Sequence, residues 1–277
     1  MAGMSARLRA IAQETEKIVA AGRYRTAAGV VDIAEQVARA LEGTTLHGPG
    51  PVPAEPGTGR SGRVEVTGES STEAARRLTA ADPGSPVAVL NFASARNPGG
   101  GYLNGAQAQA EALCRASALH ATLLRAPAYY EHHRADRDPF YTDRVIHSPG
   151  VPVFRDDRGR LLDRPFAVGF LTSPAPNAGV VRARTPHLAA RIPAALASRA
   201  ERVLETAVAH GYRRLVLGAW GCGVFRNDPA EVAGAFRALL AGEGRFAGHF
   251  DEVVFAVLDR TREGRTLAAF REAFPAA

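Results

Sequence analysis

The stretch "PVAVLNFASARNPGGGYLNGAQAQAE", residues 86–111, decides the fold. Its first eight residues are a short, mostly apolar run, which is typical of a buried parallel strand. A proline and three glycines follow, and the next residues predict a long helix from about Ala106 to Leu124. A buried strand, a glycine loop and a helix in this order indicate an α/β domain.

The same order recurs along the chain. Further strands are predicted at 63–68 (RVEVTG), 166–173 (FAVGFLTS), 213–220 (RRLVLGAW) and 251–259 (DEVVFAVLD). Helices are predicted at 71–81, opening with a capping box of Ser71 and Glu73, at 192–211 and at 229–242. Residues 125–165 look irregular. Alternating strands and helices predict a mixed, mostly parallel sheet within about 62–277.

A helical extension is expected in front of this domain. Residues 5–21 and 30–44 have helical periodicity, the second helix closing at Gly43. Residues 47–62 are rich in Pro and Gly and read as a loop or linker. We therefore place an N-terminal helical extension and linker at 1–61.

Composition bounds the class of protein. With 277 residues and 46% hydrophobic residues, the chain has the composition of an ordinary soluble domain. It has no apolar run long enough to span a bilayer, and its N-terminus lacks the apolar segment of a signal peptide. Two cysteines cannot build a disulfide framework or a Cys-only zinc site. We expect a cytoplasmic protein without membrane contact.

The net charge is +6, yet Lys17 is the only lysine, and the arginines are spread without a block of five or six. This pattern does not support a dedicated nucleic-acid tail, although a general attraction for polyanions remains.

Two glycine loops follow apolar strands and precede helices, at 97–105 and at 221–228. In open α/β sheets ligands bind at the carboxyl ends of the strands, where helix N-termini suit phosphate. Two such loops at one sheet edge can hold a diphosphate. Neither is a Walker A loop or a clean GxGxxG, which argues against an NAD-dependent oxidoreductase. Glu111 is the acid beside the first loop, and it is either catalytic or a helix-start charge.

The blocks "NPGGGYLNGAQAQAEALCRASAL", "FLTSPAPN" and "LVLGAWGCGVFRNDPAEVA" together resemble the bacterial-type poly(ADP-ribose) glycohydrolases. The similarity runs from about Ala6 to Asp259. It implies a macrodomain-like three-layer α/β/α fold and hydrolysis of ribose–ribose glycosidic bonds to release ADP-ribose. It implies no metal and no cofactor.

The family signature is a triple glycine followed by Gln-Glu-Glu. Here the glycines are Gly99, Gly100 and Gly101, and the triplet reads Gln109-Ala110-Glu111. By this resemblance Glu111 is the general acid and base. The first glutamate of the signature is replaced by Ala110, which leaves reduced cleavage, another ADP-ribosyl linkage or an engineered change as alternatives.

The resemblance also implies binding roles. The triple glycine lies against the terminal ADP-ribose, and the diphosphate-binding loop is Gly221, Cys222, Gly223, Val224 and Phe225, with Phe225 against ribose. Asn97 and Gln109 are candidates for hydrogen bonds to ribose or to the linkage. Phe255 is a candidate for stacking on adenine, with core packing as the alternative.

Three alternatives concern function and chemistry. Besides the glycohydrolase, the sequence allows an ADP-ribose-binding module of weak activity, or a hydrolase of mono-ADP-ribosylated protein or nucleic acid.

Cys114 is expected to be a buried thiol rather than a nucleophile, and His132 and His133 lack a third ligand at metal spacing. We expect a monomer whose partners are ADP-ribose and ADP-ribosylated macromolecules, although the sequence carries no signal for oligomeric state.

Overall fold

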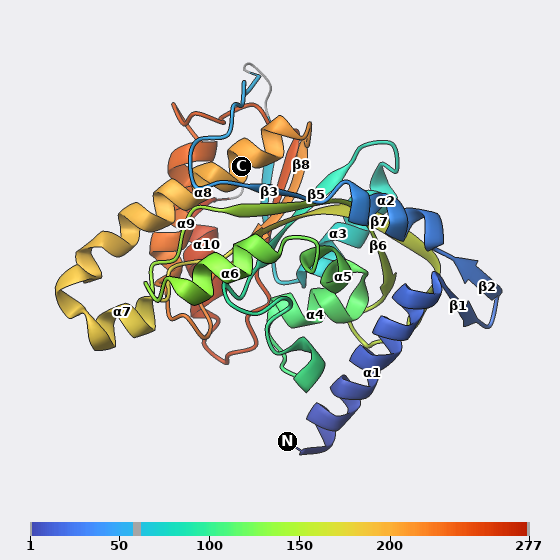
Figure 1. Cartoon of the computed structure of the whole chain (residues 1–277). Coiled ribbons are helices and arrows are strands. Elements are labelled where there is room, and N and C mark those ends of the chain that lie inside the picture. The colour runs from blue at the N-terminus through green and yellow to red at the C-terminus, as the bar shows by residue number, and fades with distance from the viewer. Residues whose placement is uncertain (1, 58–61, 276–277) are drawn as a thin grey trace.

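A seven-stranded mixed sheet is the centre of the molecule (Figure 1). The computed structural model describes residues 2–57 and 62–275. The strand order is β3-β6-β7-β5-β8-β9-β4, and β1 and β2 form a separate hairpin. The strands are β1 (Arg23–Thr26), β2 (Gly29–Asp32), β3 (Thr45–His47), β4 (Arg63–Thr67), β5 (Val87–Phe92), β6 (Val145–Arg155), β7 (Leu161–Ser173), β8 (Arg214–Gly218) and β9 (Glu252–Ala256).

The five strands β7, β5, β8, β9 and β4 run parallel, as the sequence predicts, and β6 and β3 add antiparallel pairs at one end. The central strands β5, β8 and β9 are apolar on both faces. On β5, Val87 and Val89 point into one core cluster, whereas Ala88 and Leu90 point into the other. Burial on both faces explains the continuous apolar runs that predicted these strands.

Helices cover both faces, so the molecule has three layers. The helices are α1 (Ala2–Ala21), α2 (Ala34–Glu42), α3 (Ser71–Ala81), α4 (Gln109–Ala116), α5 (Leu119–Leu123), α6 (Pro127–Ala135), α7 (Ala178–Arg184), α8 (Ile192–Ala209), α9 (Pro229–Leu240) and α10 (Arg265–Ala273), with short 3₁₀ turns at Tyr102–Asn104 (η1) and Pro186–Arg191 (η2). One core cluster takes its helical residues from α1–α6, and the other takes them from α7–α10. Figure 1 shows the blue and green helices α1–α5 apart from the orange and red helices α8–α10.

The topology brings loops that are distant in sequence to one edge of the sheet, the edge at which the parallel strands end. The carboxyl ends of β5, β7, β8 and β9 share an edge because these strands are parallel. Strand β6 runs the other way, so the residues just before Val145 lie at the same edge. Residues 93–108, 139–144, 174–177 and 219–228 therefore gather there.

The N-terminal residues are built into this architecture. Strand β3 pairs with β6 and is the outermost strand on one side of the main sheet. Helix α1 packs against η1 and α4, with Ala12 and Thr15 fully buried. The boundary at residue 62 stays a prediction.

Several boundaries differ from the sequence predictions. The helix expected at 30–44 begins at Ala34, because residues 29–32 pair with β1 as a strand. The capping box uses Ser70 rather than Ser71, with Glu73 as its acid. Residues 125–165 are not irregular, since they contain α6, all of β6 and the start of β7.

The helix expected from Ala106 to Leu124 breaks in the middle. Its first part begins at Gln109 and ends at Ala116, and Ser117 is extended and bridges Val153 on β6. The Ser117 hydroxyl donates to the Leu113 carbonyl (2.7 Å) and accepts the Leu119 N–H (3.2 Å). A serine side chain that bonds the local backbone in this way competes with the helix.

Candidate active site

The triple-glycine loop follows β5 and needs its glycines for backbone geometry. Gly99 and Gly100 have φ angles of +66° and +62°, a region that side chains with a Cβ disfavour. A Cβ on Gly99 would lie 3.1 Å from both the Cys114 sulfur and the His120 ring. The loop is therefore folded tightly onto the residues behind it, and glycine is required there.

Glu111 stands in the first turn of α4 beside this loop. Its side chain is 8% exposed, and its Oε1 accepts the backbone N–H of Gly101 at 2.9 Å. Its Oε2 is buried and has no hydrogen-bond partner among the described residues. A Cβ on Gly100 would come within 2.5 Å of Oε1, so the loop leaves just enough room for the carboxylate. A buried carboxylate oxygen without a partner requires an explanation, and proton transfer to a ligand supplies one.

Gln109 fixes the start of α4. Its side-chain oxygen accepts the Phe92 N–H (2.9 Å), and its amide donates to the Leu90 carbonyl (2.8 Å) and to the Ser71 hydroxyl (3.1 Å). Both amide hydrogens are therefore used within the protein, and the side chain ties α4 to the end of β5 and to α3. This geometry favours a positioning role for Gln109 over the ligand contact that the sequence suggested.

Ala110 lies between these two residues and is 4% exposed. Unlike Leu113 and Cys114 on the same helix, it belongs to neither apolar core cluster. The methyl group thus stands at the edge of the core, next to Glu111.

The second glycine loop follows β8, the strand beside β5. Asn227 holds it closed, because its side-chain amide donates to the Gly221 (3.1 Å) and Pro176 (2.8 Å) carbonyls. A Cβ on Gly221, whose φ is +71°, would lie 2.5 Å from that amide nitrogen and from the Cβ of Ala175. Gly221 is thus required by the loop itself.

The tip of this loop has the features of an anion site. The backbone N–H groups of Gly223, Val224 and Phe225 make no hydrogen bond to any described residue. A Cβ on Gly223 would meet nothing within 4 Å, and Val224 is 82% exposed. Successive free N–H groups at an open loop ahead of a helix suit phosphate oxygens. Cys222 is half-buried beneath them, and burial raises the pKa of its thiol to about 12, so it stays protonated.

An aromatic pair flanks the loop. The rings of Phe225 and Tyr141 lie 5.9 Å apart, and the Arg96 guanidinium lies 5.9 Å from the centre of the Tyr141 ring. Tyr141 has a φ of +59°, which is strained for a residue with a Cβ. Asn97, next to Arg96, is exposed at the same edge.

Phe255 lies in the core, so the structure favours core packing, the alternative that the sequence left open, over stacking on adenine. Its side chain is 0% exposed, and its ring stacks on Phe274 with centroids 4.5 Å apart. Phe236 and Phe270 close the other sides. Position 255 points inward because the residue alternates with Val254 on a strand buried on both faces.

Cys114 is fully buried, as predicted. Burial raises the pKa of its thiol well above the usual range, and the nearby Glu111 carboxylate adds to this, so it is not a nucleophile. His133 is buried too, and it contacts the Tyr129 carbonyl through Nδ1 (2.8 Å) and the Thr142 hydroxyl through Nε2 (2.8 Å). Among the described residues, no group of three or more His, Cys, Asp or Glu side chains is placed to hold a metal ion.

Several residues of this edge escaped the sequence analysis. Asn227 and Tyr141 are examples, and so is Ser94, whose hydroxyl accepts the Asn97 N–H (3.2 Å) at the start of the triple-glycine loop. Asn227 lies within the glycine-rich block quoted from the sequence, and a polar side chain at the end of such a loop is a sequence signal for a residue that closes it. The sequence around Tyr141 contains no such signal, since its position at the site depends on the direction of β6.

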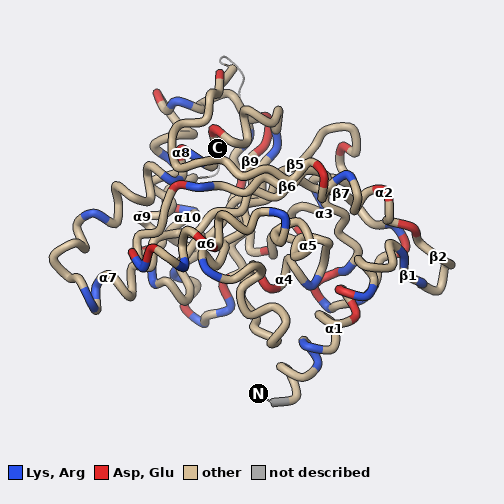
Figure 2. The backbone as a smooth tube through the Cα atoms, in the orientation of Figure 1, with Lys and Arg blue, Asp and Glu red and all other residues tan. Residues whose placement is uncertain are grey.

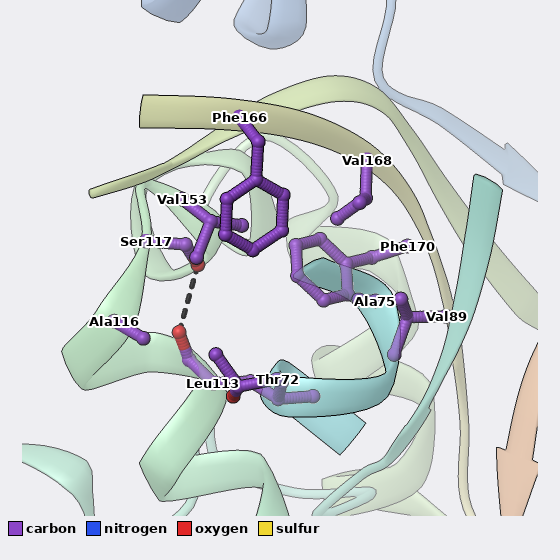
Figure 3. A pocket seen from close by; sticks show the side chains of 10 residues that line it. All are labelled: Thr72, Ala75, Val89, Leu113, Ala116, Ser117, Val153, Phe166, Val168 and Phe170. Atoms are coloured by element: carbon purple, nitrogen blue, oxygen red, sulfur yellow. Dashed lines mark hydrogen bonds between the residues drawn. The ribbon is translucent and has the colours of Figure 1, made fainter. Parts of the chain in front are cut away.

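A small cavity lies elsewhere, between α3, α4 and the sheet (Figure 3). Its walls are mainly apolar, with Phe166 and Phe170 on one side and Leu113 on another, and no charged residue lines it. It is a packing gap in the core and not a site for a charged ligand.

Figure 2 shows red and blue segments spread over the molecule. Among the described residues, no helix is long and apolar enough to cross a membrane.

The edge therefore combines one buried carboxylate, held by a glycine loop, with a loop of free N–H groups on the neighbouring strand. Such a carboxylate can act in turn as acid and base, while the second loop holds an anionic group.

Comparison with known proteins identifies relatives of the chain. The family model described as microbial-type PARG, catalytic domain, matches residues 12–156. Poly(ADP-ribose) glycohydrolase from Thermomonospora curvata is 51% identical over 97% of this chain and 99% of its own, with a TM-score of 0.90. Its structure with the inhibitor ADP-HPD gives a TM-score of 0.88 at 50% identity, with the same coverage of both chains, 97% and 99%.

A third relative is poly(ADP-ribose) glycohydrolase from Deinococcus radiodurans in complex with ADP-ribose. It is 44% identical over 88% of this chain and 99% of its own, with a TM-score of 0.80. No curated protein sequence matches the chain.

Proposed function

Because the chain belongs to the microbial-type poly(ADP-ribose) glycohydrolase family, we propose that it hydrolyses the ribose–ribose bonds of poly(ADP-ribose) and releases ADP-ribose. One observation carries the proposal. Glu111 is held by the Gly101 N–H, at the same sheet edge as the N–H groups of Gly223, Val224 and Phe225, and neither its second oxygen nor these N–H groups have a hydrogen-bond partner within 2–57 and 62–275. Complexes of relatives with ADP-ribose and with ADP-HPD support the ligand class.

Glu111 performs both proton transfers in this proposal. Its carboxylic acid gives a proton to the leaving ribose hydroxyl oxygen as the bond from that oxygen to the anomeric carbon breaks. Water then attacks the anomeric carbon and returns a proton to the carboxylate. Most glycosidases divide this work between two carboxylates. Here the diphosphate of the substrate, held by the 221–225 loop, adds negative charge that stabilises the developing cation.

The remaining site residues have supporting roles. Gly99, Gly100 and Gly101 let the backbone approach the distal ribose, and exposed Asn97 offers its amide to a ribose hydroxyl. Phe225 packs on ribose. The free thiols of Cys114 and Cys222 suit a cytoplasmic setting, where thiols stay reduced, and we propose that the protein is a monomer.

Ala110 favours a second candidate function. The family triplet has a glutamate at this position, where it helps to hold the substrate near the scissile bond, and the buried methyl group of Ala110 cannot do so. A protein that binds ADP-ribose ends but cleaves them weakly, or that prefers a mono-ADP-ribosyl linkage, fits this change.

The test is to incubate the protein with poly(ADP-ribose) and, separately, with mono-ADP-ribosylated protein and nucleic acid, and to measure free ADP-ribose by chromatography. Calorimetry with ADP-ribose, with AMP as the control, measures binding. We expect release from the polymer and binding of ADP-ribose well above that of AMP. Tight binding without release from any substrate supports the binding module, and release from mono-ADP-ribosylated substrates alone supports the redirected hydrolase.

A further inference from the structure

Helix α1 reaches the active site from behind the triple-glycine loop. Tyr102 directly follows the glycines, is 0% exposed, and points its hydroxyl at α1. That hydroxyl lies 3.0 Å from Oε1 of Glu16 and 3.1 Å from the Ala12 carbonyl oxygen. Tyr102, the first residue after the three glycines, is therefore anchored on the N-terminal helix α1.

The same Glu16 oxygen holds a second side chain under the loop. Nδ1 of His120 lies 3.1 Å from Oε1 of Glu16, and the His120 and Tyr102 rings are 5.1 Å apart. The His120 ring underlies the loop, since a Cβ on Gly99 would come 3.1 Å from it. Burial acts to raise the pKa of Glu16, but the bonds from His120 and Tyr102 outweigh it and lower the pKa, so Glu16 is ionised.

The anchored residues connect directly to the candidate catalytic group. Tyr102 is covalently joined to Gly101, whose N–H donates to Oε1 of Glu111. The Tyr102 N–H in turn donates to the Gly99 carbonyl (3.2 Å), which closes the loop. A shift of the Tyr102 ring therefore turns the peptide that orients Glu111.

The structure assigns to Glu16 the role of a positioning residue, which sets the Gly101 N–H and so the direction of the Glu111 carboxylate through Tyr102 and His120. This inference rests on the proposed function. It also makes the N-terminal helix part of the active site rather than an appendage. Misplacing a reacting group by about 1 Å can cost about 100-fold in rate, which makes this support measurable.

Glu14 provides the matched control. It is on the same helix and carries the same charge, but it pairs with Arg155 (2.7 Å) and does not contact Tyr102 or His120. Glu14→Ala removes an ion pair of α1 without touching the loop. A merely structural role for Glu16 predicts that Glu16→Ala and Glu14→Ala behave alike.

The experiment compares Glu16→Ala, Glu16→Gln and Glu14→Ala with the unchanged protein, at a temperature well below every melting point. We expect Glu16→Ala to lower kcat on poly(ADP-ribose) by about 10- to 100-fold with a much smaller change in KM. Glu16→Gln, which still offers an oxygen to the Tyr102 hydroxyl, should recover part of this loss. Glu14→Ala should keep kcat within about twofold. Equal kcat values for Glu16→Ala and Glu14→Ala would overturn the inference.

Amide hydrogen exchange at Gly101, followed by NMR, separates this inference from the proposed function. Glu16→Ala should speed exchange at Gly101 relative to Glu14→Ala, because the N–H loses its fixed partner. An unchanged exchange rate overturns the positioning role even if the protein proves to bind ADP-ribose without cleaving it. Absence of ADP-ribose release from the unchanged protein counts against the proposed function alone.

Discussion

The backbone N–H of Gly101 and the carboxylate of Glu111 are joined by a 2.9 Å hydrogen bond, and the second carboxylate oxygen has no partner among the described residues. One oxygen is thus fixed by the loop and the other is free for chemistry. This relationship explains why a glycine-rich segment stands ahead of a single acid. The glycines bring backbone, rather than side chains, up to the carboxylate.

Gly100→Ala should impair catalysis more than folding. The new Cβ would lie 2.5 Å from Oε1 of Glu111, so the carboxylate must move, and we expect kcat on poly(ADP-ribose) to fall at least about tenfold. Gly150→Ala is the matched control, because Gly150 also has a positive φ (+55°) but has nothing within 4 Å of its added Cβ. Both variants should lose about 1–2 kcal/mol of stability from backbone strain. Equal kcat in the two variants would show that the loop does not constrain Glu111.

Gly223→Val should weaken binding of ADP-ribose without destabilising the fold. The added Cβ meets no protein atom within 4 Å, so the substitution leaves the fold room, while it places a side chain beside the N–H groups proposed to hold the diphosphate. We expect the affinity measured by calorimetry to fall at least about tenfold, or 1.4 kcal/mol, with little change in melting temperature. Gly50→Val, also in open space, is the control. A collapsed melting transition with normal binding by the residual folded protein would make Gly223 structural.

Ala110→Glu should increase the cleavage of poly(ADP-ribose). It restores the family triplet Gln-Glu-Glu directly beside the candidate general acid. Ala110→Gln adds similar volume without charge and should produce a smaller gain. If Ala110→Glu lowers release of ADP-ribose from the polymer, then alanine is the residue suited to this chain's own substrate.

Two buried histidines should lower the free energy of unfolding at acid pH. Burial lowers the pKa of His147 to about 3 and that of His133 to about 4, below the value near 6.5 expected in the unfolded chain. The unfolded chain therefore binds more protons below about pH 6.5, and stability falls as pH drops toward 4, by about 1.4 kcal/mol per pH unit for each histidine. Urea unfolding from pH 7 to pH 5 measures this slope.

His147→Gln isolates one histidine in that measurement. Among the described residues, the His147 side chain is hydrogen-bonded to the Tyr212 hydroxyl (2.9 Å), and His210 stacks on its ring. Neither of these two neighbours carries a carboxylate. The variant should have a shallower slope than the unchanged protein. Identical slopes would mean that His147 is not held neutral by the fold.

The sequence predicts the parallel core well because its central strands β5, β8 and β9 are apolar on both faces, β4 alternates in polarity, and each strand is followed by a helix with its own periodicity. It fails for β6, whose antiparallel pairing interrupts that order with proline and glycine at 149–150. It also misses the break at Ser117, which depends on a bridge to a strand 36 residues further along the chain. Pairings of this kind arise from tertiary contacts and leave no local periodicity.

The candidate site divides in a similar way. Glu111 and both glycine loops are candidates from the sequence because they lie in contiguous motifs. The surroundings of Gln109 and Phe255 depend on contacts that no local pattern shows, three hydrogen bonds in one case and a ring of phenylalanines in the other. Glu16, Tyr102 and His120 are separated by up to 104 residues, and only the fold brings them together.

Turnover of Glu111→Gln on poly(ADP-ribose), measured beside its affinity for ADP-ribose, tests the central claim most directly. Glutamine keeps the size of the side chain and can still accept the Gly101 N–H, but it neither donates the proton to the leaving oxygen nor takes one from water. Loss of general acid–base catalysis predicts a fall of about 10²- to 10⁴-fold in kcat. Affinity for ADP-ribose should change by less than about tenfold. If Glu111→Gln turns over the polymer as fast as the unchanged protein, Glu111 is only a charge at the start of a helix and the account is wrong.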